Sequence, residues 1–375
     1  MASLTSPLTT YSDTTPQKRI ITDVISLIDP SDMPAIDALG GFDGASSKFR
    51  FVNGKGKTIE WLEDTLISLT GALNGSITSN VTTITLSDGD NFQEGHILQV
   101  DSERMWVSAV NNSTEVLTVT RAFGGTTGAT HADSASVTIV GMARLEGADS
   151  DDIAFTDRTV GSNYTQIFHS EVKVSRSQNQ ISQYGIAEEM AYQENKVIPS
   201  LTRLLERQFY YGTTSAAGSA TTPRMMGGYQ AFVTDNKVSG ATLAQSQFEN
   251  AVKAAYSDGG SGPWSAFVSP TNFQKIKNFY DSSVFLRVDR TENTVGMVVE
   301  QILTPYGMVN LVLDRWAKDS EIAIIDPKHA GFVTFYPFTA EPLAKSGDYE
   351  RSEVVGEFSL AIRQDKAHAM LSAVS

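Results

Sequence analysis

Residues 57–66 and 163–177 have the hydrophobic pattern of β-strands with apolar side chains on both faces. In a half-buried strand only one face is apolar, because successive side chains point to opposite sides. The opposing apolar residues are Ile59 and Trp61 against Leu62 and Leu66 in the first segment, and Tyr164, Phe168, Val172 and Val174 against Ile167 in the second. A two-stranded ribbon is marginally stable in water, so the pattern predicts a long hairpin that other chains cover.

The first 44 residues are predicted to form an N-terminal arm with short helices. Thr15 and Pro16 are typical of a helix start, and Asp29 with Pro30 ends that helix. A second fragment runs from 32 to 39. Helices this short do not persist alone, so the arm docks either on another chain or on the core of its own chain. The apolar face of the first helix consists of Ile20, Ile21, Val24, Ile25 and Ile28.

The stretch between the two hairpin segments predicts a small all-β domain. Its short β-rich runs are separated by turn signals at Asp88-Gly89, Asn111-Asn112 and Gly124-Gly125. This spacing is typical of a β sandwich or barrel. The expected strands are 81–86, 96–100, 105–110, 115–120 and 136–140.

The rest of the chain predicts a mixed α+β domain with one long helix. Residues 182–211 repeat apolar side chains at spacings of three, four and seven, and Pro199 inside this pattern kinks or divides the helix. Further helices are expected at 243–256 and 271–280, with a third near 295–303. The expected strands are 264–268, 308–313, 321–325, 331–335, 353–360 and 367–371.

The composition of the chain excludes several classes of function. With 41% apolar and 19% charged residues, the 375-residue chain has the composition of a globular protein. Its formal net charge of -14 argues against phosphate binding by the chain as a whole, and the absence of cysteine excludes disulfides and thiolate metal sites. The pattern supports neither a signal peptide nor a membrane span. A site of synthesis in the cytosol is expected.

The chain shows no convincing catalytic, cofactor or metal motif. Gly56-Lys57-Thr58 lacks the first glycine of a phosphate-binding loop, and Ser261 lacks the last glycine of a nucleophile elbow. The five histidines are far apart, and the acidic run 149–152 lacks the rest of a calcium loop. One basic cluster is either a solvated face or a contact with acidic groups of a neighbour or with nucleic acid; it comprises Lys48, Arg50, Lys55 and Lys57.

The order of these elements resembles that of the major capsid proteins of tailed bacteriophages. The resemblance covers nearly the whole chain and is closest to the branch with an inserted β domain in the extended loop. The segments that carry it are EWLEDTL at 60–66, VNLVLDRW at 309–316, IDP at 325–327, LAKSGD at 343–348, VGEFSL at 355–360 and KAH at 366–368.

The resemblance implies an α+β tailed-phage capsid fold with an all-β insertion domain. Some relatives in this family form a lysine–asparagine crosslink; none is predicted here, because no residue triad for one stands out. The implied regions are an N-terminal arm at 1–44, an extended loop hairpin at 45–70 and 143–178, the inserted β domain at 71–142, a peripheral domain with the long spine helix at 179–221 and 346–375, and a mainly axial domain with some peripheral strands at 222–345.

We therefore expect a non-enzymatic subunit that self-assembles into a phage capsid and encloses double-stranded DNA. Its implied partners are many copies of itself in hexameric and pentameric capsomers, a portal, scaffolding or decoration proteins and the packaged DNA, with assembly in the host cytoplasm and no membrane or cofactor. The alternatives are a tail or fibre protein that binds through the β domain and, third, an enzyme. The residues expected at subunit interfaces are Ile20, Ile21, Val24, Ile25, Ile59, Trp61, Leu62, Leu66, Tyr164, Phe168 and Val172.

Overall fold

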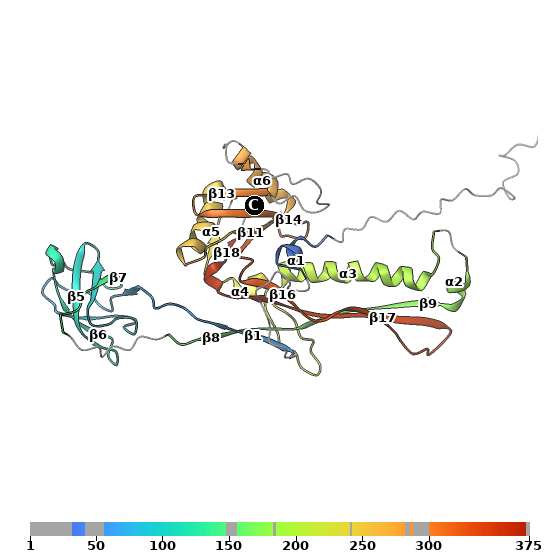
Figure 1. Ribbon diagram of the computed structural model, residues 1–375, viewed down its shortest axis with the longest axis horizontal. Helices are drawn as coiled ribbons and strands as arrows, with labels where there is room; N and C mark the ends of the chain where they lie inside the picture. Colours follow the sequence, from blue (N-terminus) through green and yellow to red (C-terminus); the bar gives the residue numbers. More distant parts are fainter. Residues whose placement is uncertain are drawn as a thin grey trace, which may run out of the picture. The chain divides into compact units, whose positions relative to one another are not determined.

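The computed structural model describes residues 32–41, 56–147, 156–182, 185–240, 242–281, 286–287 and 300–372. The chain divides into two compact units (Figure 1). We call residues 62–160 the β unit, and residues 1–61 with 161–375 the main unit. The divisions fall inside strands β1 (Thr58–Glu63) and β8 (Thr159–Tyr164), which pair with each other.

The β unit is one six-stranded antiparallel sheet that closes on itself. The strand order is β2-β7-β4-β5-β6-β3, and the two end strands meet where Leu73 bridges Leu86. Backbone hydrogen bonds from Asn74 to Thr85 and from Ser87 to Ala72 complete the closure. The bounds are β2 Thr70–Ala72, β3 Thr83–Thr85, β4 His96–Val100, β5 Glu103–Asn111, β6 Val116–Thr120 and β7 Ser136–Met142, with a short 3₁₀ helix at Phe123–Gly125.

The β unit has a hydrophobic core of its own. Alternate residues of its strands point inward, as Met105 and Val107 do on β5 and Leu117 and Val119 on β6, and all four are buried. The five strands expected from the sequence are confirmed, although β3 is shorter than expected and β5 longer. The turn signals mark the ends of these strands, which is why the pattern was informative here.

The main unit contains a seven-stranded mixed sheet with order β10-β18-β15-β11-β14-β13-β12. Helices α5 (Gln245–Ser257) and α6 (Pro270–Asp281) pack on one face of this sheet. Strand β11 is buried on both faces, so its sequence WSAFV is almost continuously apolar. The strands are β10 Lys237–Ser239, β11 Trp264–Val268, β12 Leu286–Arg287, β13 Glu300–Thr304, β14 Gly307–Leu313, β15 Glu321–Ile325 and β18 Ala369–Ser372.

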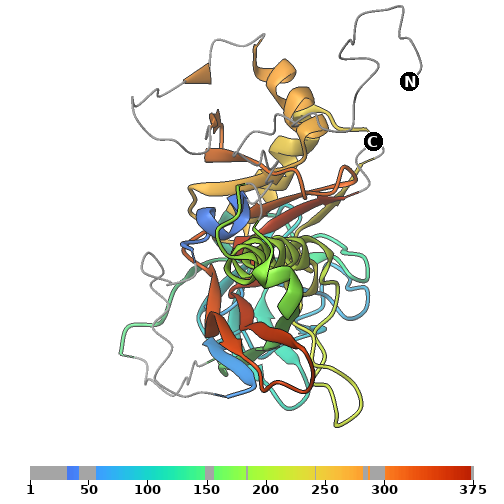
Figure 2. The same ribbon diagram turned by 90° about the vertical axis from the view of Figure 1, so that its right-hand side faces the viewer.

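A second core of the main unit surrounds the long helix α3 (Glu189–Tyr211). The three-stranded sheet β16-β17-β9 lies along one side of α3, and the short helix α1 (Pro34–Ala38) lies on another side (Figures 1 and 2). Pro199 is inside the helix, which continues through it. The remaining bounds are β9 Gln166–Ser175, β16 Ala330–Pro342, β17 Tyr349–Ile362, α2 Arg176–Gln180, α4 Tyr229–Phe232 and a 3₁₀ helix at Asp365–Ala367.

The predicted pairing of 57–66 with 163–177 holds only at the start of the second segment, where the Thr165 N–H donates to the Lys57 carbonyl. Strand β1 pairs with β8, which ends at Tyr164, whereas β9 pairs antiparallel with β17 over ten residues. Residues 163–177 therefore contain the last residues of β8 and the whole of β9. Read alone, β9 has one apolar face, with Phe168, Val172 and Val174 buried, and only Ile167 on the other face is apolar and exposed.

The third helix expected near 295–303 is also wrong where the structure describes that region. Residues Glu300–Thr304 form β13, which pairs antiparallel with β14. A tight turn joins these strands; Gly307 adopts φ 147°, and the Thr304 hydroxyl donates to the Gly307 carbonyl at 2.7 Å. The other expected helices and strands after residue 240 are present. The helix expected in the first 30 residues lies outside the described residues.

Candidate functional site

Two of the residues expected at a subunit interface are buried inside their own chain. Ile59 and Trp61 of β1 are 8% and 6% exposed and pack with Ala361 of β17. The indole of Trp61 meets Phe232 edge-on, with 5.7 Å between ring centroids. The expectation that these side chains need another copy for cover is therefore wrong, because the main unit already shelters them.

Gly161 and Asn163 of β8 fix the position of the paired strands β1 and β8 in the main unit. A Cβ on Gly161 would lie 2.6 Å from Cε2 of Trp61, so only glycine leaves room for the indole. The buried Asn163 amide donates to the carbonyls of Gly227 and Leu360 and accepts from the Gly227 N–H at 2.9 Å. Asn163 is not predictable from the sequence, since nothing local identifies bonding partners that are 64 and 197 residues away.

Phe168 and Val172 of β9 are buried beneath α3. Each is 6% exposed, and the ring of Phe168 lies 6.4 Å from that of Phe358 on the paired strand. Leu201 and Leu205 of the helix belong to the same core. As with Trp61, the apolar surface of these two residues is used within the chain, which corrects the expectation that they are uncovered.

Leu62 and Leu66 remain exposed, as the hairpin pattern predicted. Their exposed fractions are 67% and 95%, and Leu69 further along the same segment is 61% exposed. Tyr164 is half-buried. A subunit contact through these residues stays a prediction. The arm residues expected at the interface lie outside the described residues; they are Ile20, Ile21, Val24 and Ile25.

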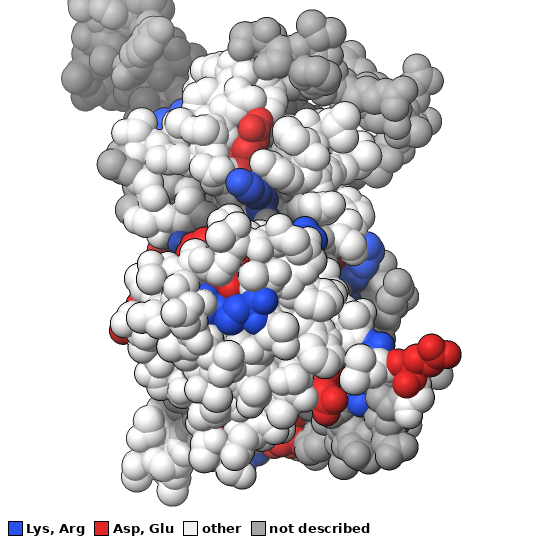
Figure 3. All heavy atoms as spheres, turned by 90° about the vertical axis from the view of Figure 1, so that its left-hand side faces the viewer, with Lys and Arg blue, Asp and Glu red and all other residues white. Residues whose placement is uncertain are grey.

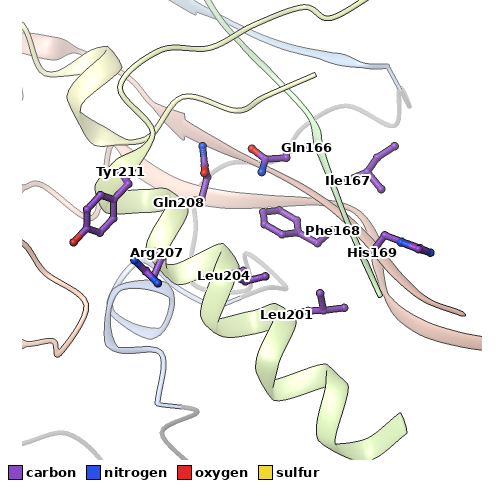
Figure 4. Close-up of a pocket in the computed structure, with 9 residues that line it drawn as sticks. All are labelled: Gln166, Ile167, Phe168, His169, Leu201, Leu204, Arg207, Gln208 and Tyr211. Carbon is purple, nitrogen blue, oxygen red and sulfur yellow. The ribbon is translucent and has the colours of Figure 1, made fainter. Parts of the chain in front are cut away.

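A groove runs between α3 and β9 in the main unit (Figure 4). Its volume is about 480 Å³, and a second hollow of about 420 Å³ follows the same helix and strand toward Val197. Ile167, Leu204 and Tyr211 line the first hollow and are half exposed. Strand β9 is also an outer strand of its sheet. The groove therefore offers apolar side chains beside a strand edge, which suits an extended protein segment better than a small molecule.

A buried carboxyl group of α3 anchors the short helix α1. Glu206 accepts hydrogen bonds from the backbone N–H groups of Ala35 at 2.7 Å and Ile36 at 3.2 Å. Burial, together with the neighbouring carboxyl group of Asp314, raises the pKa of Glu206 to about 10. Asp314 in turn accepts from the Tyr210 hydroxyl at 2.7 Å. The raised pKa keeps Glu206 protonated at neutral pH, and its two hydrogen bonds tie α1 to α3.

The described residues offer binding surfaces and structural polar networks. They contain no cluster of three or more His, Cys, Asp or Glu side chains that could hold a metal ion. No helix among them is long and apolar enough to cross a membrane. On the face in Figure 3, the charged side chains of described residues are scattered among uncharged ones.

Comparison with known proteins agrees with this arrangement. Residues 8–375 match the family model of the SU10 major capsid protein. The chain belongs to this family. This capsid protein is similar in fold to a chain in the capsid of a native GTA particle, with a TM-score of 0.52, 10% identity and 100% of both chains covered. No curated protein matches its sequence.

Two phage structures are also similar. The Mycobacterium phage Bobi chain gives a TM-score of 0.49 at 10% identity, covering 98% of this chain and 99% of that one. The capsid of Myoviridae phage XM1 gives 0.49 at 9% identity, covering 95% and 97%. The family places this capsid protein in the virion, as a structural subunit of a shell built from many copies. The prediction of a phage capsid subunit is confirmed.

Proposed function

We propose that shells of this capsid protein enclose double-stranded DNA and assemble in the host cytoplasm from hexameric and pentameric capsomers. A portal, and scaffolding or decoration proteins, are the further partners. The match to the family over residues 8–375 carries this proposal. The protein's role is mechanical and not enzymatic: repeated contacts between copies hold the shell closed around the genome.

The segment 62–69 of one copy is proposed to contact the groove between α3 and β9 of another. Leu62, Leu66 and Leu69 are exposed in the single chain. The groove presents Ile167 and Leu204 beside an outer strand. Burying one leucine side chain contributes about 1.5–3 kcal/mol, so three per copy would add up over a whole shell.

Particle formation tests this contact. The full chain is expressed and particles are counted by negative-stain electron microscopy. We expect Leu66→Asp to reduce the yield of closed shells at least tenfold. The matched control is Thr65→Asp, because Thr65 is also exposed and the control adds the same charge without removing an apolar side chain. Equal yields from the two variants would contradict the contact, and rings or trimers from the wild type would contradict the proposed function.

A further inference from the structure

On one flank of α3, cationic side chains lie over aromatic rings. Arg203 and Arg207 are one helical turn apart, and their guanidinium carbons lie 5.7 and 5.8 Å from the ring centroid of Trp316. Arg207 also lies 5.4 Å from the Tyr211 ring, and Lys318 Nζ lies 4.9 Å from it. We call these five residues the arginine–aromatic face. Figure 4 shows Arg207 and Tyr211 on the same flank of the helix.

This face has a local excess of positive charge. Lys318 is paired with Glu321 at 3.5 Å, and the adjacent Arg315 is paired with Asp32 at 2.7 Å. Within the part of the chain that the structure describes, neither Arg203 nor Arg207 forms an ion pair. Asp319 nearby is exposed. Like charges four residues apart destabilise a helix, so two unpaired arginines are unexpected in a chain with a net charge of -14.

Stacking on aromatic rings orients an arginine for phosphate recognition. The guanidinium carbons of Arg203 and Arg207 lie within the roughly 6 Å range of a cation–π contact with Trp316, and a guanidinium group has several N–H donors to offer a phosphate oxygen. One turn of helix separates the two arginines by about 6 Å along the axis, and each strand of duplex DNA has one phosphate per about 3.4 Å of its axis. Both side chains can therefore reach phosphates of one strand.

We propose that the arginine–aromatic face binds the phosphate backbone of duplex DNA without sequence preference. This inference rests on the proposed enclosure of DNA. Weak contacts of two or three charges per subunit, repeated over the shell, would hold the outermost layer of packaged DNA. The basic side chains supply the contacts to the phosphates, and the aromatic rings hold the guanidinium groups in place beside one another.

Salt-dependent binding tests the proposal. Fluorescence anisotropy is measured with the unassembled full chain and a labelled 20-base-pair duplex of mixed sequence, from 25 to 200 mM salt. A plot of log affinity against log salt concentration has a negative slope. For Arg203→Gln/Arg207→Gln, we expect the magnitude of this slope to be smaller than that of the wild type by about 2. The control Lys237→Gln/Lys253→Gln removes two other exposed charges and should keep the wild-type slope. Equal slopes for all three proteins, or no binding by wild type, would overturn the proposal.

Arg207 also lines the groove with β9, so assembly is measured on Arg203→Gln, which changes the arginine outside that lining. We expect Arg203→Gln to form shells at wild-type yield, to keep the wild-type circular dichroism spectrum and to reduce the magnitude of the salt slope by about 1. Loss of shells with unchanged DNA affinity would assign the arginines to a contact with another copy and overturn the proposal. Failure of the wild type to form shells would instead contradict the proposed function, whatever the DNA result.

Discussion

The two units bury a glutamate in opposite ways. Glu103 of the β unit is fully buried and accepts hydrogen bonds from the side chains of Arg121 and His131 and from the backbone N–H groups of Ala122 and Ala129. Burial alone would raise the pKa of Glu103, but these donors outweigh it and lower the pKa to about 2. Glu206 of the main unit instead lies against another carboxyl group, and its pKa is raised to about 10.

The two glutamates differ in the form that their surroundings favour: Glu103 is held ionised, and Glu206 is held protonated. Around Glu103, every donor favours the ionised form, so the network stabilises the closed barrel at neutral pH. Around Glu206, the backbone N–H groups of α1 favour ionisation, while burial and Asp314 oppose it. The folded main unit is therefore stabilised by the protonated form of Glu206, whereas the folded β unit is stabilised by the ionised form of Glu103.

The largest effect is expected from Glu103→Gln. The substitution leaves the buried Arg121 guanidinium without a charged partner, and we expect the β unit to lose about 3–5 kcal/mol of stability. Urea unfolding read by a brief deuterium pulse and mass spectrometry reports each unit separately. The exposed Glu146→Gln in the same unit is the control and should change stability by less than about 0.5 kcal/mol. A loss below about 1 kcal/mol for Glu103→Gln would contradict a strongly stabilising role of this network in the β unit.

The two units should respond to pH with opposite sign. The pKa of Glu103 is about 2 in the folded β unit against an ordinary 4.5, so its stabilisation is complete above pH 4.5 and is lost as pH falls toward 2. The pKa of Glu206 is about 10 in the folded main unit against 4.5, so its contribution is complete below pH 4.5 and is lost as pH rises toward 10.

For Glu103, the free energy of unfolding of the β unit should fall by about 3 kcal/mol as the pH falls from 4.5 to 2. For Glu206, that of the main unit should fall by about 3 kcal/mol as the pH rises from 4.5 to 7. The same urea titrations at pH 3, 5, 7 and 9 measure both, with Glu103→Gln and Glu206→Gln as the variants in which the respective dependence should flatten. A main unit whose stability is constant between pH 5 and 9 would contradict the raised pKa of Glu206.

A smaller loss is expected from Arg121→Lys. Arg121 donates to both carboxylate oxygens of Glu103 at 2.7 Å and also to the carbonyls of Thr78, Val81 and Ala129. Lysine keeps the charge but cannot make this set of bonds, so the β unit should lose about 2 kcal/mol. Arg104→Lys at an exposed position of β5 is the matched control. An unchanged urea midpoint for Arg121→Lys would mean that charge alone suffices.

The smallest effect is expected from Tyr210→Phe. The substitution removes the hydroxyl that donates to Asp314 and should cost the main unit about 1 kcal/mol. Tyr211→Phe is the control, since the neighbouring tyrosine is half exposed. If both variants unfold at the wild-type urea concentration, the Asp314 carboxyl group does not depend on this donor.

Sequence patterns predicted the elements better than their partners. Strands β4 to β7 and helices α3, α5 and α6 follow from alternation, periodicity and turn residues, which are local signals. The fold class followed from their order. The pairing of β9 with β17 did not, because it joins residues about 180 positions apart and two adjacent strands looked like one.

The exposed leucines of the candidate contact were predictable, whereas the buried polar groups were not. Leu62 and Leu66 interrupt a strand pattern on its polar face, which is visible in the sequence. Glu206 looks like any other polar residue of a long helix, because its partners are a backbone segment 170 residues earlier and a carboxyl group 108 residues later. Trp61 was misjudged for the same reason, since its cover comes from Phe232 and Ala361.

The bridge between Leu73 and Leu86 affects how closely copies of the β unit can be placed without aggregating. Open β-sheets expose unsatisfied amide and carbonyl rows along their borders, through which identical molecules stick together. Because the barrel joins its first and last strands, it presents no such row between them. Many copies of the β unit can then be concentrated on one particle without fusing into fibrils.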